Sequence, residues 1–389
     1  MYHYGITIRE YREKAKMTQQ QLADRWPKSE RFGGGEGVNL NYIQDIEHGR
    51  KRIDDQQTLR KVCTLLHIPL WKVGLGEYDP FTDAIIGKST YAETFGLIDF
   101  TLRHIWILRQ AALLRQAEEA MHQLGTLFTY FQTDDTPPLH LEARYLHLLA
   151  DYQCINGVLA VDAGQYSQAL SYYQRMHAIA EALDDPALIA HALMNLGVEY
   201  DRKKDHRQSI PYLEEARDYS FKTTKAWSVI IHSYLSRAYA SAGNTARFQQ
   251  ANDTARRLSA HLAPDFLQDT EEVYYTASSI LAERSGGWLA LGKPKKALAL
   301  REEITGQLLL DKDNRLQGWM RLDYAKAYRM LGEIEQAIAE LRVFYRHCRE
   351  MGSAHALSHV TDMLADLDKE GYREVQVVKD FREEVRQQH

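Results

Sequence analysis

Residues 37–49 read Gly-Val-Asn-Leu-Asn-Tyr-Ile-Gln-Asp-Ile-Glu-His-Gly, and this stretch predicts a short helix with both ends marked. Asn39 is a good N-cap, because its side-chain oxygen can accept hydrogen bonds from the free amides of the first turn. Gly49 supplies the left-handed residue that ends the helix. Ile43 and Ile46 point inward together, which leaves a mostly polar second face. A helix that reads DNA has such a face, and here it consists of Leu40, Asn41, Gln44, Asp45 and His48.

The flanking segments predict a small domain of short helices. Thr7-Ile8-Arg9-Glu10 and Thr18-Gln19-Gln20-Gln21 both place a hydroxyl at the cap and an acid or amide three residues on. Each therefore predicts a capping box at the start of a helix. Residues 58–66 carry leucine and valine at helical spacing, and Pro69 ends this pattern before a final turn that contains Trp71 and Val73.

Two of these stretches, Met17–Ala23 and Tyr42–Arg50, together resemble the Xre-type, lambda-repressor-like helix-turn-helix. The resemblance covers about residues 6–75 and implies a DNA-binding domain over residues 1–75. It implies that the outward side chains of the 37–49 helix face base edges and that nearby polar and basic residues hold phosphates. The DNA-binding residues are therefore expected to be Gln19, Asn39, Leu40, Asn41, Gln44, Asp45, Arg50, Lys51 and Arg52.

The ten residues from Pro27 to Glu36 depart from the family pattern, because such domains have a tight turn at this place. Three consecutive glycines, Gly33–Gly35, favour a solvated loop, and surface insertions of this kind are well tolerated. The alternative is that Lys28 and Arg31 reach a phosphate or the minor groove beside the site.

Length and charge indicate more than one domain. A chain of 389 residues exceeds what one hydrophobic core usually serves. Residues 1–75 carry 13 Lys and Arg against 9 Asp and Glu, whereas the rest carries 35 against 44. A mildly basic N-terminal part and an acidic remainder suit a nucleic-acid-binding domain attached to a larger part that does not bind DNA. The excess of four positive charges is modest, so we expect a homodimer that gains avidity on an inverted-repeat operator.

Several protein classes are disfavoured. The three scattered cysteines, Cys63, Cys154 and Cys348, are too few for a disulfide framework or a zinc site and indicate a reducing compartment. The N-terminus is no signal peptide, and charges interrupt the most apolar helix candidate, residues 97–114. We therefore expect a cytoplasmic protein with no membrane contact.

Catalytic constellations are also missing from the sequence. No zinc helix or serine elbow occurs, and Gly33–Gly35 lacks the lysine and hydroxyl that follow in a nucleotide-binding loop. The 16 histidines are dispersed and are expected to be surface or core residues. We expect no enzyme, no cofactor and no metal.

Beyond residue 75 helical periodicity runs almost throughout. Residues 76–88 are expected to be a linker, and a long helical pair is predicted from about Ser89 to Phe131. From Leu139 onward a pattern recurs in which a small residue, an aromatic residue, a turn residue and another small residue stand 3, 4 and 5 positions apart, with substitutions in some copies. Its five occurrences are Gly157, Ala160, Gly164 and Ala169; Gly197, Tyr200, Lys204 and Ser209; Ser236, Tyr239, Gly243 and Phe248; Ser285, Trp288, Gly292 and Ala297; and Ala325, Tyr328, Gly332 and Ala337.

Each occurrence predicts a helical hairpin, because small residues let helices approach and glycine turns the chain. The pattern resembles the tetratricopeptide repeat. The expected fold is all-α, with the helix-turn-helix domain followed by a right-handed α-solenoid of tetratricopeptide-like hairpins over residues 89–389. Residues 262–270 look like extra length in a degenerate part of the array, and residues 372–385 like a terminal cap. The dimer contact is expected from about Leu316 onward, with apolar area from Phe344, Tyr345, Val377 and Val378.

A solenoid of hairpins makes a concave groove lined by the first helix of each unit. Asn195 stands where peptide-binding repeats carry an asparagine that can hold a peptide backbone. Acidic groove positions include Asp151, Asp162 and Glu283. The alternative is that most of these are ordinary solvated residues. The candidate ligand-binding residues are His191, Asn195, Arg202, Tyr234, Arg237, Trp319, Asp323, Lys326 and Arg329.

An Xre-type reader followed by such an array resembles the peptide-pheromone-responsive regulators of Gram-positive bacteria, the Rgg, PlcR, PrgX and NprR group. The resemblance implies a cytoplasmic dimer that senses a short imported peptide, as in quorum sensing, and alters its binding to double-stranded DNA. The residues themselves do not show whether the effector is a peptide or another small molecule. Two alternatives stay open: an interaction scaffold that docks a partner protein, and an enzyme regulator with a vestigial DNA-binding head.

Overall fold

The computed structural model confirms the all-α class. Helices make up the described chain, and its one strand-like pairing is an isolated bridge between Pro27 and Glu36. The structure describes residues 4–28, 35–53, 55–68, 70–73, 75, 88–111, 113–133, 136–262, 275–311 and 314–387. Contacts divide the chain into a first unit, Met1–Thr94 with Asp134–Tyr145, and a second unit, Phe95–Thr133 with Leu146–His389. The predicted linker, residues 76–88, lies outside the described residues except for Lys88.

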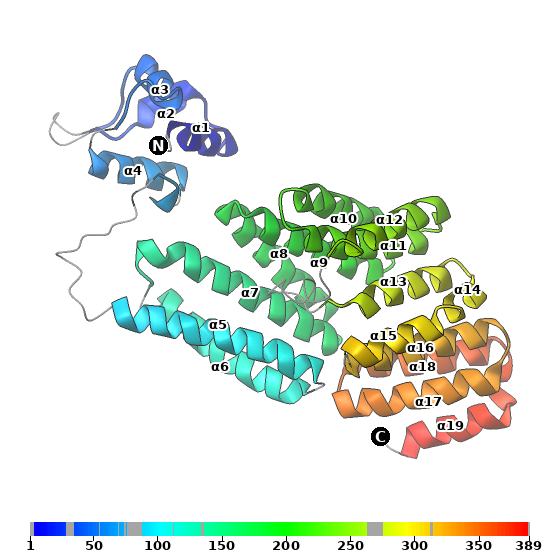
Figure 1. Ribbon diagram of the computed structural model, residues 1–389. Helices are drawn as coiled ribbons and strands as arrows, with labels where there is room; N and C mark the ends of the chain where they lie inside the picture. The colour runs from blue at the N-terminus through cyan, green and yellow to red at the C-terminus, as the bar shows by residue number, and fades with distance from the viewer. Residues whose placement is uncertain are drawn as a thin grey trace. The chain divides into compact units, whose positions relative to one another are not determined.

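The first unit packs short helices around one apolar core (Figure 1). Trp26, Ile43 and Ile46 lie fully buried in it, so α2 and α3 share their inward faces. The helices are α1 (Gly5–Lys14), α2 (Gln19–Arg25), α3 (Leu40–Glu47) and α4 (Gln56–Leu66), followed by the 3-10 turn η2 (Leu70–Val73) and, after the next two helices of the chain, η3 (Leu139–Leu141).

One of the two predicted capping boxes is confirmed and the other is wrong. At the start of α2, Thr18 Oγ1 accepts from the amide of Gln21 at 3.1 Å, and the Gln21 side chain accepts from the amide of Thr18 at 2.8 Å. Thr7 instead lies buried inside α1, which begins at Gly5. The cause is tertiary packing: the hydroxyl of Tyr4 hydrogen-bonds to Ile53, which fixes the chain one turn before Thr7.

The insertion between α2 and α3 leaves and rejoins the domain at one place. Lys28 N donates to Gly35 O at 2.9 Å, and Gly37 N donates to Trp26 O at 2.8 Å. These bonds close the neck of the insertion, so its length does not disturb the packing of α3 on α2. Arg31 lies outside the described residues, whereas Lys28 is exposed at the neck.

The second unit confirms the helical pair and the hairpin array (Figure 1). The pair is α5 (Lys88–Gln110), whose first turns belong to the first unit, and α6 (Leu114–Thr133). The array follows as α7 (Glu142–Asp162), α8 (Tyr166–Leu183), α9 (Pro186–Arg202), α10 (His206–Ser220), α11 (Lys225–Ser241), α12 (Thr245–Ser259), α13 (Ala277–Ala290), α14 (Pro294–Leu298), α15 (Arg301–Asp311), α16 (Asn314–Met330), α17 (Ile334–Met351), α18 (Ala354–Lys369), the 3-10 turn η4 (Tyr372–Glu374) and α19 (Gln376–Gln387).

The repeated pattern has the predicted structural meaning. All five turn residues have positive φ, from 61° at Lys204 to 78° at Gly243. All five residues at the fourth position are buried. The first position brings helices together, since a Cβ added at Gly157 would lie 2.3 Å from the ring of Tyr173 on α8. The fourth hairpin is irregular, because its second helix is split into α14 and α15. The extra length predicted at residues 262–270 lies outside the described residues except for Leu262.

The predicted C-terminal cap is confirmed, and three of the four apolar side chains predicted for the dimer contact are buried beneath it or within it. Val378 and Phe381 of α19 pack into the core that α17 and α18 form. Phe344 and Tyr345 lie in the same core, fully covered. Phe344, Tyr345 and Val378 therefore cannot supply apolar area to a partner. Val377 is half-buried, and a dimer contact elsewhere from Leu316 onward stays a prediction.

Candidate functional site

α3 presents a polar face between two fixed ends, as its sequence predicts. Asn39 Oδ1 accepts from the amide of Asn41 at 2.9 Å, and Gly49 takes the left-handed conformation, with φ of 75°. Ile43 and Ile46 anchor the opposite face in the core. Asn41 is exposed, whereas Leu40, Gln44 and Asp45 are half-buried.

Asp45 holds the basic segment that follows α3. Its carboxylate lies 3.0 Å from Arg50 Nε and 3.5 Å from Lys51 Nζ, and its carbonyl accepts from both backbone amides. Lys51 also lies over the ring of Tyr42, 5.6 Å from its centroid. The exposed cations of residues 50–52 are thereby held beside the end of α3. Asp45 can approach a base only by giving up these ion pairs.

A buried ion pair beneath α3 was missed by the sequence reasoning. Arg12 Nε lies 2.6 Å from Glu47 Oε1, its Nη2 lies 3.1 Å from Oε2, and its Nη1 donates to Met17 O at 2.9 Å. The hydrogen bond to Glu47 is the main cause that raises the pKa of Arg12. A signal for Glu47 did exist, because it stands four residues after Ile43 and so on the inward face.

The same carboxylate fixes Gln19. Gln19 Nε2 donates to Glu47 Oε2 at 2.7 Å, and its Oε1 accepts from Gln44 Nε2 at 3.5 Å. The predicted phosphate contact Gln19 and the predicted base contact Gln44 are therefore linked through one network to the core. Such links hold side chains in place before a ligand arrives.

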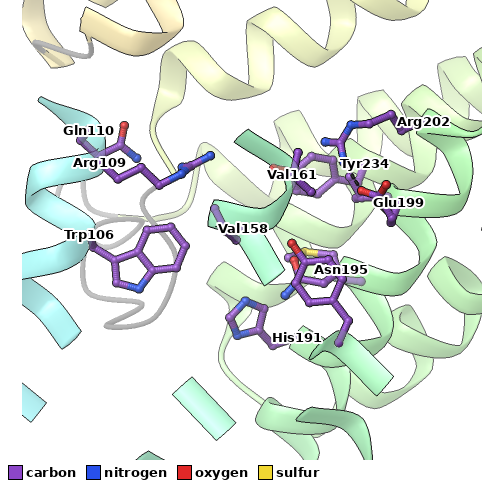
Figure 2. A pocket seen from close by; sticks show the side chains of 13 residues that line it. Trp106, Arg109, Gln110, Val158, Val161, His191, Asn195, Glu199, Arg202 and Tyr234 are labelled. Atoms are coloured by element: carbon purple, nitrogen blue, oxygen red, sulfur yellow. Dashed lines mark hydrogen bonds and ion pairs between the residues drawn. The ribbon is translucent and has the colours of Figure 1, made fainter. Parts of the chain in front are cut away.

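In the second unit, a pocket of about 160 Å³ lies between α5, α7, α8, α9 and α11 (Figure 2). This volume matches a cavity that can hold one benzene-sized group. Its apolar wall consists of Val158, Val161, Tyr173, Met194 and Val198, and its other lining residues are Trp106, Arg109, Gln110, His191, Asn195, Glu199, Arg202 and Tyr234.

Four of the predicted ligand-binding residues meet in this pocket: His191, Asn195, Arg202 and Tyr234. Asn195 Nδ2 contacts Cys154 Sγ at 3.5 Å, and sulfur is only a weak acceptor. His191 is 1% exposed and packs on Trp227, with its ring centroid 4.8 Å away. His191 is therefore placed to support the pocket wall. The side-chain amide of Asn195 can still form hydrogen bonds with a ligand.

Glu199 and Tyr234, which also line the pocket, have pKa values that burial shifts. Arg202 pairs with Glu199, whose carboxylate is fully buried. Burial raises the pKa of Glu199, and Arg202 counteracts this only in part. Burial likewise raises the pKa of Tyr234, so its hydroxyl stays protonated and can donate.

The wall opposite Asn195 comes from α5, which the sequence reasoning did not include (Figure 2). Trp106, Arg109 and Gln110 line it, and Arg109 Nε lies 2.8 Å from Asp162 Oδ2. The signal was Arg109 itself, one of the charges that interrupt an otherwise apolar helix. Asp162, expected in the groove, is instead 2% exposed and held by Arg109 and Arg315, so it is not available to a groove ligand.

The other five predicted ligand-binding residues lie outside the pocket lining. Arg237 Nη1 is 3.4 Å from Glu283 Oε2, and Lys326 Nζ is 3.9 Å from Asp323 Oδ1. Burial disfavours the charge on Arg237, but Glu283, Asp323 and Asp201 outweigh it and raise the pKa. Burial lowers the pKa of Lys326 and raises that of Glu283. These residues, Asp201, Arg237, Glu283, Asp323 and Lys326, form what we call the charged cluster.

Trp319 and Arg329 are engaged within the fold. Trp319 packs on Phe344, His355 and His359, with centroids 5.3 to 5.5 Å apart. Arg329 Nη1 lies 2.5 Å from Asp366 Oδ2. Both residues are therefore tied to the C-terminal hairpins.

The described residues contain neither a metal-binding cluster nor a membrane-spanning helix. No group of three or more His, Cys, Asp or Glu side chains there could hold a metal ion. No described helix combines the length and the apolar character needed to cross a membrane. The three cysteines are buried and not in disulfides.

Comparison with known proteins gives a distant likeness among solved structures. No family model and no curated protein matches the chain. Among solved structures, it is similar to Bacillus thuringiensis PlcR in a crystal structure with the peptide PapR7 and DNA. The two share 12% sequence identity, with 90% of this chain and 97% of that chain covered, at a TM-score of 0.41. Similarity at this level does not assign a function, which has to be argued from this chain's own residues.

Proposed function

We propose that the protein is a transcriptional regulator, a cytoplasmic homodimer that binds double-stranded DNA through α3 and senses a short peptide through its repeat unit. The observation that supports the proposal of DNA binding is the fixed polar face of α3 with an exposed basic segment at its end. A helix of this size fits the major groove, and cations at its end can reach the phosphates.

The contacts divide into two classes. Asn41 and Gln44 can each pair an adenine edge through both amide atoms, and Leu40 can touch a thymine methyl. Asp45 could accept from cytosine, in competition with its own ion pairs. Phosphate contacts would come from Arg50, Lys51, Arg52 and Gln19, with Lys28 at the neck of the insertion as a further candidate.

The peptide half rests on the pocket and the charged cluster, which belong to the same unit. The pocket has room for one side chain, and Asn195 can hold a backbone amide beside it. The mixed charges of the cluster suit the ends or the polar side chains of an extended peptide. A differential affinity of about 1 to 3 kcal/mol between two states of the protein would change operator affinity by roughly 5- to 150-fold.

The DNA half is tested by comparing Asn41→Ala with Arg52→Ala. We expect Asn41→Ala to cost about 1 to 3 kcal/mol on the selected operator and little on random DNA, because only a base contact carries sequence information. Arg52→Ala should weaken both complexes alike and reduce the salt dependence of binding. Fluorescence anisotropy over a salt series measures both. Equal losses on the two DNAs for Asn41→Ala would show that α3 does not read bases.

The peptide half is tested by titrating candidate peptides from the host's secreted short reading frames and reading binding heat and operator occupancy together. We expect Asn195→Ala to lose peptide binding, while Gln249→Ala, an exposed amide on α12, retains it. A partner protein retained on pull-down, with no peptide changing operator occupancy, would favour the scaffold hypothesis instead.

A further inference from the structure

α5 carries two apolar stripes on different faces. The inner stripe, Phe95, Ile98, Leu102 and Ile105, is buried against the rest of the second unit. The outer stripe, Leu97, Phe100, His104 and Ile107, has the same steps of three, four and three residues. One stripe attaches the helix to its own chain. The second stripe has no such use among the described residues.

The outer stripe is exposed to an unusual degree for its composition. Leu97 is 62% exposed, Phe100 66% and Ile107 63%, and the ring of His104 stacks on that of Phe100 at 6.2 Å. A Cβ built on Gly96, beside the stripe, meets nothing within 4 Å. By contrast, the exposed face of α12 is mostly charged or amide, with Arg247, Gln249, Gln250, Asp253, Arg256 and Arg257.

We propose that the outer stripe of α5 is the surface on which a second copy of this chain docks, with the two α5 helices antiparallel about a two-fold axis that passes between their outer stripes, midway between Leu97 and Ile107 along the helix. Steps of three and four residues are those of a coiled-coil seam, which packs each apolar side chain between neighbours on the other helix. The inference rests on the proposed function in so far as that function requires a two-fold dimer, and it supplies the exposed apolar area that the buried Phe344, Tyr345 and Val378 cannot.

The choice of a second copy follows from the symmetry of the stripe. Leu97 and Ile107 stand five residues on either side of Leu102, and Phe100 and His104 stand two on either side. In an antiparallel pair, Leu97 therefore meets Ile107 of the other copy, and Phe100 meets its His104. A surface that matches itself under a two-fold rotation is what an isologous dimer needs.

Charge beside the stripe does not oppose this pairing. Arg103 Nε lies 3.2 Å from Asp99 Oδ1 in the same helix, so the nearest cation brings its own counter-charge into the interface. The small residues Gly96 and Ala111, both exposed, permit close approach of the two helices.

The mass of the full-length protein in solution tests the surface. We expect a dimer for the wild type at micromolar concentration without DNA. Leu97→Glu with Ile107→Glu should raise the dimer dissociation constant by roughly 100-fold or more, because like charges would meet at both ends of the stripe. The matched control is Leu309→Glu with Leu310→Glu on α15, where the side chains are 72% and 74% exposed. The control should remain dimeric, with the helical content of both variants unchanged by circular dichroism.

Cross-linking tests the antiparallel register. Positions 97 and 107 are ~15 Å apart along the helix, beyond the reach of a short bismaleimide. A mixture of Leu97→Cys and Ile107→Cys chains should cross-link into heterodimers, while neither variant alone should. The native cysteines are buried and do not compete.

Other outcomes would overturn the proposal. A monomeric wild type, a charged variant that stays dimeric, or a control that dissociates equally would each do so. A monomeric Leu97→Cys variant whose introduced thiol resists alkylation would assign the stripe to a segment of the same chain. Operator binding by such a monomer would refute the dimer but keep DNA binding by α3, whereas a dimer through α5 that ignores DNA would refute the DNA-binding function and keep the surface.

Discussion

At the scale of single residues, the most consequential contact is the buried pair of Arg12 and Glu47. Removing two charges from water is costly, and the cost is recovered here by two hydrogen bonds between them and further bonds to Met17 O and Gln19. The pair joins α1 to the last turn of α3. It therefore helps to set where the polar face of α3 lies.

We expect Glu47→Ala to lower the free energy of unfolding of the first unit by about 3 to 5 kcal/mol, because it leaves the largely buried Arg12 with only the exposed Glu13 as a counter-charge. Glu13→Ala is the control. Glu13 also pairs with Arg12 but is 53% exposed, so a much smaller loss is expected. Hydrogen exchange of the α3 amides measures both. Equal protection in the two variants would mean that the ion pair does not hold α3.

The residues that sequence could predict in this domain are those whose partners are local. Asn39 caps α3 by accepting a hydrogen bond from the amide two residues later, and Gly49 ends the helix through its own left-handed conformation. Glu47 pairs with a residue 35 positions earlier, and nothing in its neighbourhood names that partner. The capping box predicted at Thr7 is wrong for the same reason: the start of α1 depends on a distant contact, that of Tyr4 with Ile53.

At the scale of elements, glycine sets how closely helices approach. Gly157→Ala would place a methyl group 2.3 Å from a ring carbon of the buried Tyr173. We expect a net loss of about 1 to 3 kcal/mol from this overpacking, although alanine favours helix. Gly306→Ala on α15 is the control, because a Cβ there meets nothing within 4 Å, and it should gain up to about 1 kcal/mol. Urea unfolding followed by circular dichroism compares them, and a gain in both would contradict the close α7–α8 contact.

The hairpins were predictable because each turn is a local feature repeated at a recognisable spacing. Which helix packs on which other helix was harder to predict. The burial of Phe344 depends on α19, and the pocket depends on α5, which precedes the repeats. The candidate site was accordingly half predicted: Asn195, Arg202 and Tyr234 come from one face of successive hairpins, whereas Trp106 and Arg109 come from outside the periodic pattern.

At the largest scale, Asp162 ties distant parts of the second unit together. Its carboxylate binds Arg109 of α5 and Arg315 of α16, and its carbonyl accepts from Ser353 Oγ at 3.1 Å. Just after it in the chain, the start of α8 adds a second link, because the hydroxyl of Tyr166 lies 2.9 Å from His355 Nδ1. Arg109 also lines the pocket, so a ligand that moves Arg109 would disturb the connection between the early and late hairpins.

Asp162→Asn should therefore lower the free energy of unfolding of the second unit by about 3 to 5 kcal/mol at pH 7, because two largely buried arginines lose their shared counter-charge. Asp99→Asn is the control, since its pair with Arg103 is solvent-exposed and contributes about 1 kcal/mol or less. Denaturant titrations followed by circular dichroism give both values. Equal losses in the two variants would contradict a structural role for Asp162.

The pH dependence adds a check with a definite sign. Burial disfavours the ionised form of Asp162, but Arg109 and Arg315 outweigh burial and lower its pKa below the ordinary value of 3.8. A carboxyl with a lowered pKa binds its proton less readily in the folded state than in the unfolded state. Its contribution to stability is therefore fully present well above pH 3.8 and is lost as the pH falls through the folded-state pKa. The difference between the wild type and Asp162→Asn should shrink in that acidic range, and a difference that instead widened would show that the carboxylate is not held by the two arginines.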